Sequence, residues 1–185
     1  RRDLRDEEIF TIDGDDTKDI DDAISIKRLS NGNYELGVHI ADVSYYVREG
    51  SPLDNEAMER GTSVYLVDRV IPMLPHELSN GICSLNPDVD RLAMSCVMEF
   101  DSTGKQLNYE IFPSVIRSRM QMTYKKVNCI LEDNVVPEGY EPYENSIRLM
   151  GELTKILRKA KVKRGYIDFG VDEAKILVDE KCVPT

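Results

Sequence analysis

Short stretches in which apolar and polar residues alternate are spread along most of this chain. Residues 23–29 and 34–40 form one such pair, with an Asn-Gly turn signal between them. Residues 92–100 and 106–117 form a second pair around a short polar turn. A period of two is typical of strands that bury one face, and Asn-Gly favours a tight hairpin. The pattern therefore predicts two antiparallel hairpins.

Three other segments carry the marks of helices. Ser51 can cap a helix that begins at Pro52 and stops at Gly61. A second helix is predicted over residues 123–131. The longest is predicted over residues 145–163, where six apolar residues recur at helical spacing: Ile147, Met150, Leu153, Ile156, Leu157 and Ala160.

Hairpins combined with separate helices indicate an α+β fold. We predict a mostly antiparallel sheet, shaped as a partial barrel, with helices packed on it. Weaker patterns predict further strands, at residues 9–12, 62–67, 166–169 and 175–178. Proline, glycine and asparagine interrupt the segments predicted as irregular or loop, which are residues 69–75, 78–87 and 133–144.

Length, charge and hydropathy exclude several classes of protein. With 185 residues and 41% hydrophobic side chains, the chain is long enough to bury one core. Its net charge of −10 argues against a protein that coats nucleic acid in general, although one local basic face could still hold RNA. No apolar run is long enough to span a bilayer and no signal peptide is recognisable, so we expect no membrane partner.

Cysteine usage favours a reducing compartment. The four cysteines are widely spaced without a paired motif, and the chain has only two histidines. Structural zinc sites need closely spaced Cys and His ligands, so zinc is not expected. Unpaired thiols are ordinary in cytoplasmic proteins, and we expect this protein to be cytoplasmic.

The highest concentration of ionisable side chains lies in residues 13–22, of which six are aspartates. Apolar residues flank this block on both sides, so it lies between two segments that favour burial. Crowded carboxylates repel each other, and a hard divalent cation is the ligand that would neutralise them. A solvated surface loop is the simpler alternative.

Two known acidic motifs fit this block poorly. An EF-hand loop starting at Asp13 would need glycine at Lys18 and glutamate at Ile24. A phosphatase-type strand-end motif accommodates Asp13 and Asp15, but Asp16 stands where that motif has glycine. Its fold also needs repeated strand–helix units, which the sequence does not predict. A phosphatase-like, metal-dependent phosphoester hydrolase therefore stays an alternative.

The string from Thr11 to Ala23 resembles a different signature. Thr-Ile-Asp-Gly followed by Asp-Ile-Asp-Asp-Ala is similar to the catalytic motif of the ribonuclease II and ribonuclease R family, the RNB domain. Asp-Leu-Arg at residues 3–5 resembles the approach to that motif. Residues 39–44 and 65–92 resemble further family stretches, the second of them closest to the bacterial ribonuclease R branch. The resemblance covers essentially the whole chain.

This resemblance implies roles for individual residues. The four family aspartates correspond to Asp13, Asp19, Asp21 and Asp22, which become the candidate metal ligands and catalytic residues. It implies one or two Mg²⁺ or Mn²⁺ ions held mainly by Asp13 and Asp22 with help from Asp19, and no small-molecule cofactor. Loss of Asp21 is implied to harm the chemistry most. His39, within a resembling stretch, is interpreted as a core residue rather than a ligand.

Two aromatic residues are implied to contact RNA. In the family, a tyrosine at the place of Tyr65 stacks on RNA near the 3′ end, and Phe169 matches a phenylalanine that stacks on the last base. The family usually has an acidic residue next, where this chain has Gly170. Basic residues also cover one face and the end of the long helix, where they either offset the helix dipole or hold an RNA backbone.

The resemblance implies a processive 3′-to-5′ exoribonuclease that hydrolyses RNA to nucleoside 5′-monophosphates by two-metal-ion chemistry. Its partner would be the 3′ end of single-stranded RNA. A metal-binding or RNA-binding module without chemistry is a further alternative, although all four aspartates are present.

We expect residues 1–185 to be a single, truncated domain, the N-terminal portion of an RNB catalytic domain. The chain starts without methionine and lacks the family's Ser-Pro-Ile-Arg string, whose arginine helps to stabilise the scissile phosphate. Cold-shock and S1-type RNA-binding domains are expected in the parent chain. The 185 residues alone are therefore expected to be a weak nuclease or inactive.

Overall fold

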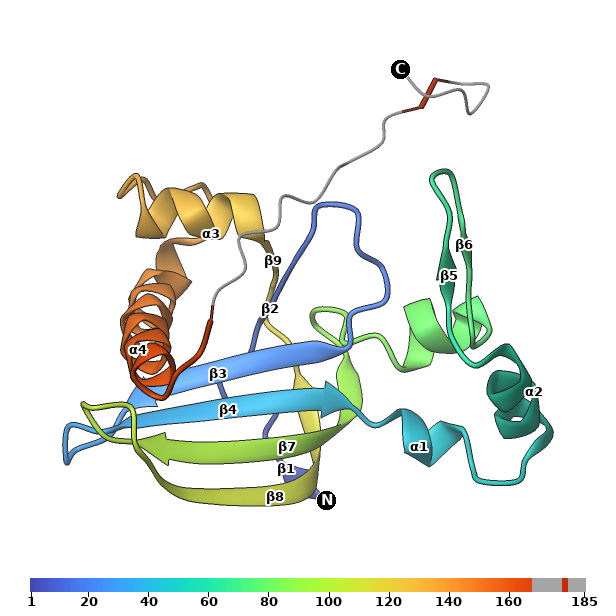
Figure 1. Ribbon diagram of the computed structural model, residues 1–185, viewed down its shortest axis with the longest axis horizontal. Coiled ribbons are helices and arrows are strands. Elements are labelled where there is room, and N and C mark those ends of the chain that lie inside the picture. The colour runs from blue at the N-terminus through green and yellow to red at the C-terminus, as the bar shows by residue number, and fades with distance from the viewer. Residues whose placement is uncertain (168–177, 180–185) are drawn as a thin grey trace.

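The computed structural model describes residues 1–167 and 178–179, and Figure 1 shows their arrangement. At its centre is a five-stranded sheet with the order β1-β8-β7-β4-β3. Its strands are β1 (Arg2–Asp3), β3 (Asp22–Arg28), β4 (Tyr34–Ala41), β7 (Asp90–Phe100) and β8 (Gln106–Arg117). All neighbours run antiparallel except β1 and β8, which are parallel. Within the described residues the sheet is open, and the predicted α+β class is confirmed.

Both predicted hairpins are present. β3 pairs with β4 from Asp22 opposite Ile40 to Arg28 opposite Tyr34. Gly32 in their turn has a φ of +84°, a left-handed conformation that glycine adopts without steric cost. β7 pairs with β8 along their length, with one irregularity near the turn. The strand that begins at Asp22 is therefore held in a fixed register by its partner.

The three predicted helices are present as α2 (Pro52–Arg60), α3 (Tyr124–Leu131) and α4 (Glu144–Lys163), and a short α1 (Val43–Tyr46) precedes them. The Ser51 hydroxyl caps α2 by accepting a hydrogen bond from the Asp54 amide at 3.2 Å. Gly61 ends the same helix in the left-handed region. The Thr123 hydroxyl caps α3. The predicted ends of α2, at Ser51 and Gly61, are thus confirmed.

Two clusters of buried side chains join the helices to the strands. Leu153 of α4 packs with Ile26, Tyr34 and Phe100 of the large sheet. A small sheet of two parallel strands, β2 (Thr11–Asp13) and β9 (Gln121–Thr123), packs with α3 and α4. The buried members of that second cluster are Phe10, Met122, Val127, Ile130, Tyr140 and Ile147. As Figure 1 shows, α3 and α4 lie together at one end of the molecule.

A third cluster lies where the acidic block meets the large sheet. Its buried members are Ile9, Ile20, Ala23, Ala41, Leu85, Ala93 and Ile116. Ile20 comes from within the acidic block and is fully buried. Burying an isoleucine contributes about 1.5–3 kcal/mol, so this side chain holds the block against the sheet.

Two weakly patterned regions differ from the predictions. Residues 69–75, predicted as irregular, contain β6 (Val70–Ile71), which pairs with β5 (Val64–Tyr65) in a hairpin that projects from the molecule (Figure 1). Residues 78–87, predicted as loop, overlap a six-residue π-helix at Glu77–Ile82. Both predictions were wrong because the local composition suggested irregular backbone.

Contacts with residues farther along the chain explain these differences. The Ser63 hydroxyl accepts a hydrogen bond from the Met73 amide at 3.0 Å, which closes the base of the hairpin. Arg91 Nη2 donates to the Gly81 carbonyl at 3.1 Å, inside the π-helix. Neither contact can be read from a local pattern.

The C-terminal predictions fall mostly outside the described residues. This applies to the strands expected at residues 166–169 and 175–178, which stay predictions. None of the helices in the described part is long and apolar enough to cross a membrane.

Candidate metal and catalytic site

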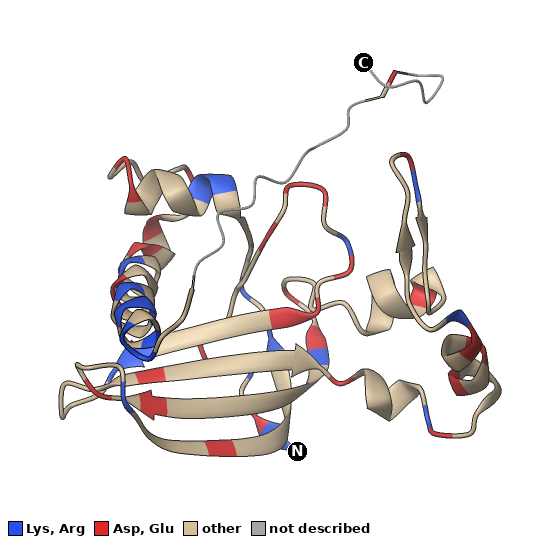
Figure 2. Cartoon of the chain, in the orientation of Figure 1, with Lys and Arg blue, Asp and Glu red and all other residues tan. Residues whose placement is uncertain are grey.

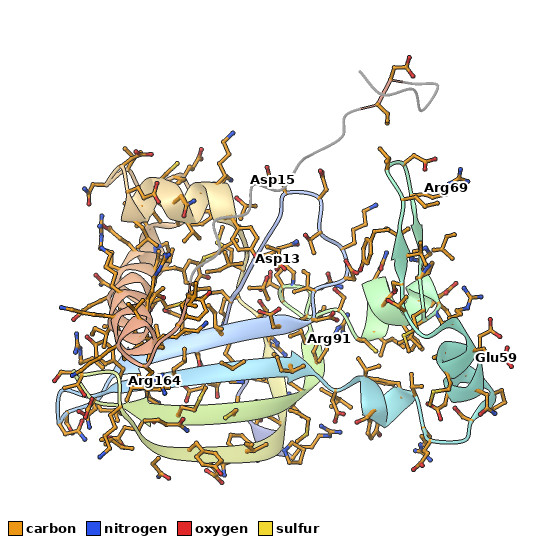
Figure 3. All side chains as sticks on the ribbon, in the orientation of Figure 1. Asp13, Asp15, Glu59, Arg69, Arg91 and Arg164 are labelled. Carbon is orange, nitrogen blue, oxygen red and sulfur yellow. The ribbon has the colours of Figure 1, made fainter. Side chains whose placement is uncertain are left out.

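The acidic block forms the loop that joins β2 to β3. Asp13 is the last residue of β2 and lies opposite Thr123 of β9, whereas Asp22 is the first residue of β3. The two ends of the block are therefore fixed by two different sheets. Figure 3 shows Asp15 at the outer end of this loop and Asp13 nearer the large sheet.

A tether from residues 83–87 holds the second half of this loop. The Ser84 hydroxyl accepts a hydrogen bond from the Ile20 amide at 3.1 Å and donates to the Lys18 carbonyl at 2.8 Å. The Leu85 amide donates to the Ile20 carbonyl at 2.9 Å. These bonds fix the backbone on both sides of Asp19. Ser84 was not predicted as a site residue, since residues 78–87 carried only the signal of a loop.

Arg91 supports the tether from the other side. Its Nε donates to the Ser84 carbonyl at 2.8 Å, and its Nη1 donates to the Asp90 carbonyl at 3.1 Å. Figure 3 labels this side chain below the acidic loop. Arg91 is thus a positioning residue that satisfies carbonyl groups of the tether rather than a partner of the aspartates.

The four candidate aspartates interact electrostatically. Partial desolvation is the main cause that raises the pKa of Asp13, and the charges of Asp22, Asp19 and Asp21 raise it further. Partial desolvation also raises the pKa of Asp21, followed by the charges of Asp19 and Asp22. The neighbouring carboxylates therefore make Asp13 and Asp21 harder to ionise, which a bound cation would reverse.

These residues fit a divalent cation in the chemistry of their donor atoms. Carboxylate oxygens are the ligands that Mg²⁺ and Mn²⁺ prefer, and the buried Oδ2 atom of Asp13 has no hydrogen-bond partner. As the side chains stand, no group of three Asp, Glu, His or Cys residues in the described part is placed to hold an ion together. A shared ion between the four aspartates therefore stays a prediction.

Tyr65 lies next to the acidic loop. Its ring is 68% exposed on the β5–β6 hairpin, and its hydroxyl donates to Asp19 Oδ2 at 3.4 Å. The charge of Asp19 is the main cause that raises the pKa of Tyr65. An exposed ring beside the carboxylates could support a nucleotide base, as the sequence suggested. Phe169, the second predicted stacking residue, lies outside the described residues.

His39 is a core residue, as predicted. It is 1% exposed in the middle of β4, with its Nδ1 2.7 Å from Ser95 Oγ and its Nε2 3.1 Å from Ser25 Oγ. Burial lowers the pKa of His39 to about 4, so the ring is neutral at physiological pH. Both ring nitrogens are engaged by hydroxyl groups and are not available to a metal.

The basic face of α4 is visible as a distinct feature. Figure 2 shows Lys and Arg residues along α4, whereas acidic residues mark the loop between β2 and β3. Lys161 Nζ lies 3.8 Å above the ring of Tyr166, so at least this cation contacts the chain itself.

Comparisons with known proteins match the whole chain to one family. The RNB domain matches residues 1–185. Ribonuclease R 1 of Lactococcus lactis subsp. lactis is 57% identical over 185 residues, 100% of this chain and 23% of that protein. Ribonuclease R of Thermotoga maritima is 58% identical over 181 residues, 97% of this chain and 26% of that protein.

A solved structure has the same fold. Mycoplasma genitalium RNase R in complex with ribose methylated single-stranded RNA superposes with a TM-score of 0.94 and 36% sequence identity. The match covers 100% of this chain and 29% of that chain. This chain therefore spans about a quarter of the length of the curated relatives that it matches.

Proposed function

This chain belongs to the RNB domain family, and from that membership we propose that it is the N-terminal part of the catalytic domain of a processive 3′-to-5′ exoribonuclease. The substrate would be the 3′ end of single-stranded RNA, and the products would be nucleoside 5′-monophosphates. The names of the relatives and the RNA-bound solved structure support this proposal. The observation that carries it is the acidic loop, in which the charges of neighbouring aspartates raise the pKa of Asp13. The buried Oδ2 atom of Asp13 has no hydrogen-bond partner.

In this proposal Asp13 and Asp22, with help from Asp19, hold one or two Mg²⁺ or Mn²⁺ ions. Such ions, when bound, lower the pKa of water and stabilise charge on a scissile phosphate. The chain's own contribution is a loop whose backbone is already fixed by Ser84, so the carboxylates need little reorganisation. Asp21 is the residue whose loss should harm the reaction most.

Tyr65 would hold a base beside this loop. Stacking on an aromatic ring contributes about 1–3 kcal/mol per base and tolerates any sequence, as an enzyme that degrades RNA stepwise requires. The hydrogen bond to Asp19 fixes the ring next to the acidic loop. Phe169 is the proposed second stacking platform.

The alternatives have less support. A phosphatase-like hydrolase would need repeated strand–helix units, whereas the large sheet of the described part consists mainly of antiparallel strand pairs. A module without chemistry would not need all four aspartates in one loop.

We also propose that the protein acts in the cytoplasm and that its remaining three quarters include cold-shock and S1-type domains. Three described cysteines are free thiols, consistent with a reducing compartment.

Asp21→Asn in the full-length protein tests this proposal. We expect single-turnover hydrolysis of 5′-labelled polyadenylate with Mg²⁺ or Mn²⁺ to fall at least about a hundredfold, because one electrostatic group of the site is lost. The dissociation constant for RNA should change little, since one carboxylate is a small part of the binding surface. Asp15→Asn is the matched control, because Asp15 lies on the same loop and is exposed.

Normal cleavage by the Asp21→Asn variant would refute the assignment, and an equal loss in Asp15→Asn would show a general effect of loop charge. The same assay compares the 185-residue chain with the full-length protein. We expect the shorter chain to be weakly active or inactive, since it lacks the family's downstream arginine.

A further inference from the structure

A cavity of about 350 Å³ lies between the acidic loop and the β5–β6 hairpin. Asp16, Lys18 and Asp19 line it from the loop, and residues of the hairpin and the π-helix line the opposite side. Figure 3 shows Arg69 on the hairpin, across from the acidic loop. Ligand pockets in proteins usually measure about 300–1,000 Å³, so this cavity suits one small molecule rather than a length of polymer.

The two walls of the cavity differ in charge. The loop wall carries the carboxylates of Asp16 and Asp19 beside the ammonium group of Lys18. The opposite wall carries Arg69 and His76, and its described lining residues include no carboxylate. A ligand that fits both walls has an anionic group at one end and hydroxyl donors at the other. A polyanionic RNA strand fits poorly, because the loop carboxylates would repel its phosphates.

The groups that could bind an anion are weakly engaged. Within the described residues, the side chains of Lys18 and His76 form no hydrogen bond or ion pair. Arg69 is paired with its neighbour Asp68, at 3.2 Å between Nε and Oδ2, and remains 69% exposed. An ion pair with this exposure contributes little and is easily exchanged for a phosphate, which a guanidinium group binds well.

Neutral residues complete the lining. Val70 and Pro72 provide apolar surface, and Ser79 and Asn80 add polar groups from the π-helix. Apolar walls with a few convergent polar groups are typical of small-molecule sites. Asp19 belongs both to this cavity and to the candidate metal ligands, so the cavity adjoins the proposed reaction site.

We propose that this cavity holds one nucleoside 5′-monophosphate, the product of the proposed function, on which this inference rests. The phosphate binds Arg69 and His76, and the ribose hydroxyls donate to Asp16, because carboxylates are good acceptors for a diol. The base lies against Val70 and Pro72. A nucleotide cut from the RNA end would occupy this cavity before release, and free nucleotide would inhibit by occupying it.

Calorimetric titration of the full-length protein with adenosine 5′-monophosphate in EDTA tests the proposal without catalysis or metal. We expect saturable binding that is at least about tenfold weaker for the double variant Arg69→Ala, His76→Ala, because charge-assisted bonds are lost. Adenosine, which lacks the phosphate, should also bind at least about tenfold more weakly. Arg48→Ala removes an exposed cation that does not line the cavity and should leave the affinity unchanged.

No saturable binding, or binding that a folded double variant leaves unchanged, would overturn the proposal. If the double variant does not fold, amide NMR shifts of Ser79 and Asn80 in the unaltered chain decide, since the nucleotide should move both. If the full-length protein is an active exonuclease but binds no nucleotide in this cavity, the inference about the cavity is wrong and the proposed function stands. Nucleotide binding without exonuclease activity would refute the proposed function alone.

Discussion

Asp13 shows at the scale of one residue how the candidate site opposes stability. Partial desolvation and the charge of Asp22 raise its pKa above the value expected in the unfolded chain. A carboxyl group with a raised folded-state pKa binds its proton more tightly in the folded protein, so stability falls as pH rises through that range. At neutral pH the ionised Asp13 therefore destabilises the fold.

Asp13→Asn should raise the melting temperature of the chain in EDTA, because the amide removes a poorly compensated charge. Millimolar Mg²⁺ or Mn²⁺ should raise the melting temperature of the unaltered chain, since an ion that binds only the folded state stabilises it. The variant should lose this metal response. Differential scanning fluorimetry measures both effects, and Asp15→Asn should show neither. An undiminished metal response in Asp13→Asn would contradict the metal site.

His39 makes a second contribution to pH dependence, through the core. Its pKa is about 4 in the folded protein because the ring is buried, against about 6.5 in an unfolded chain. Between pH 4 and pH 6.5, His39 is mostly protonated in the unfolded state and mostly neutral in the folded state. Stability is therefore fully present above pH 6.5 and is lost as the pH falls toward 4.

We expect this residue to cost about 2 kcal/mol of unfolding free energy between pH 7 and pH 5, measured by urea denaturation. The raised pKa values of Asp13 and Asp21 act in the opposite direction, so the result is read by comparing variants. His76→Gln, at the chain's other histidine, should keep the full loss. His39→Gln should be less stable at pH 7 and show a smaller loss. The reverse pattern would contradict this account of the core.

At the scale of elements, the sequence predicted the hairpins and helices whose signals are local, such as alternation, turn residues and helix caps. The hairpin of β3 and β4 follows from alternation and a glycine turn, and α2 follows from Ser51, Pro52 and Gly61. β5 lies within the strand predicted at residues 62–67. In contrast, β6 and the π-helix were missed, because the Met73–Ser63 and Arg91–Gly81 contacts that stabilise them leave no periodic pattern in the sequence.

The candidate site likewise has one part that could be predicted from the sequence and another that could not. The acidic loop was predictable because its aspartates are adjacent in sequence and lie between apolar strands. Ser84 was not, since it lies 64 residues from Ile20 along the chain and contacts it only in the fold. The position of Tyr65 beside Asp19 likewise depends on a hairpin that the sequence did not indicate.

The β5–β6 hairpin places the Tyr65 hydroxyl within 3.4 Å of Asp19 Oδ2, and under the proposed function the ring also stacks on a base. Tyr65→Ala in the full-length protein should lengthen the final product, because losing a stacking platform of about 1–3 kcal/mol releases short ends earlier. Tyr65→Phe keeps the ring and should leave the product length unchanged. Denaturing gels of labelled polyadenylate measure both. An unchanged final product in Tyr65→Ala would leave this residue without a role in holding RNA.

For the whole molecule, α4 covers only part of one face of the large sheet. Tyr34 and Ile40 lie on the same face, since they are separated by an even number of residues along β4. Tyr34 packs beneath α4, whereas Ile40 and its pairing partner Met94 are exposed. Tyr109 and Ile111 of β8 extend this exposed apolar face, and each is 61% exposed. Apolar areas of this kind usually mark a surface that another element covers.

The 185-residue chain should therefore self-associate as its concentration rises, as measured by size-exclusion chromatography with light scattering. Ile111→Lys places a charge in the middle of the apolar face and should shift the equilibrium toward monomer. Val135→Lys alters an exposed apolar residue in a loop outside this face and should not. A chain that stays monomeric at high concentration, or an equal effect of both variants, would contradict this interpretation of the face.

The tether at Ser84 also determines how the site responds to ionic strength. In the part of the chain that the structure describes, hydrogen bonds between uncharged groups and the buried Ile20 hold the acidic loop, and no ion pair to one of its aspartates is present. Dissolved salt screens interactions between exposed charges over about 10 Å at 0.1 M, but it hardly weakens bonds of this kind. Added salt should therefore relieve repulsion among the aspartates without loosening the loop. Under the proposed function, a change of RNA affinity with salt would then report on counterions of the nucleic acid and on screening of the aspartates, not on a loosened loop.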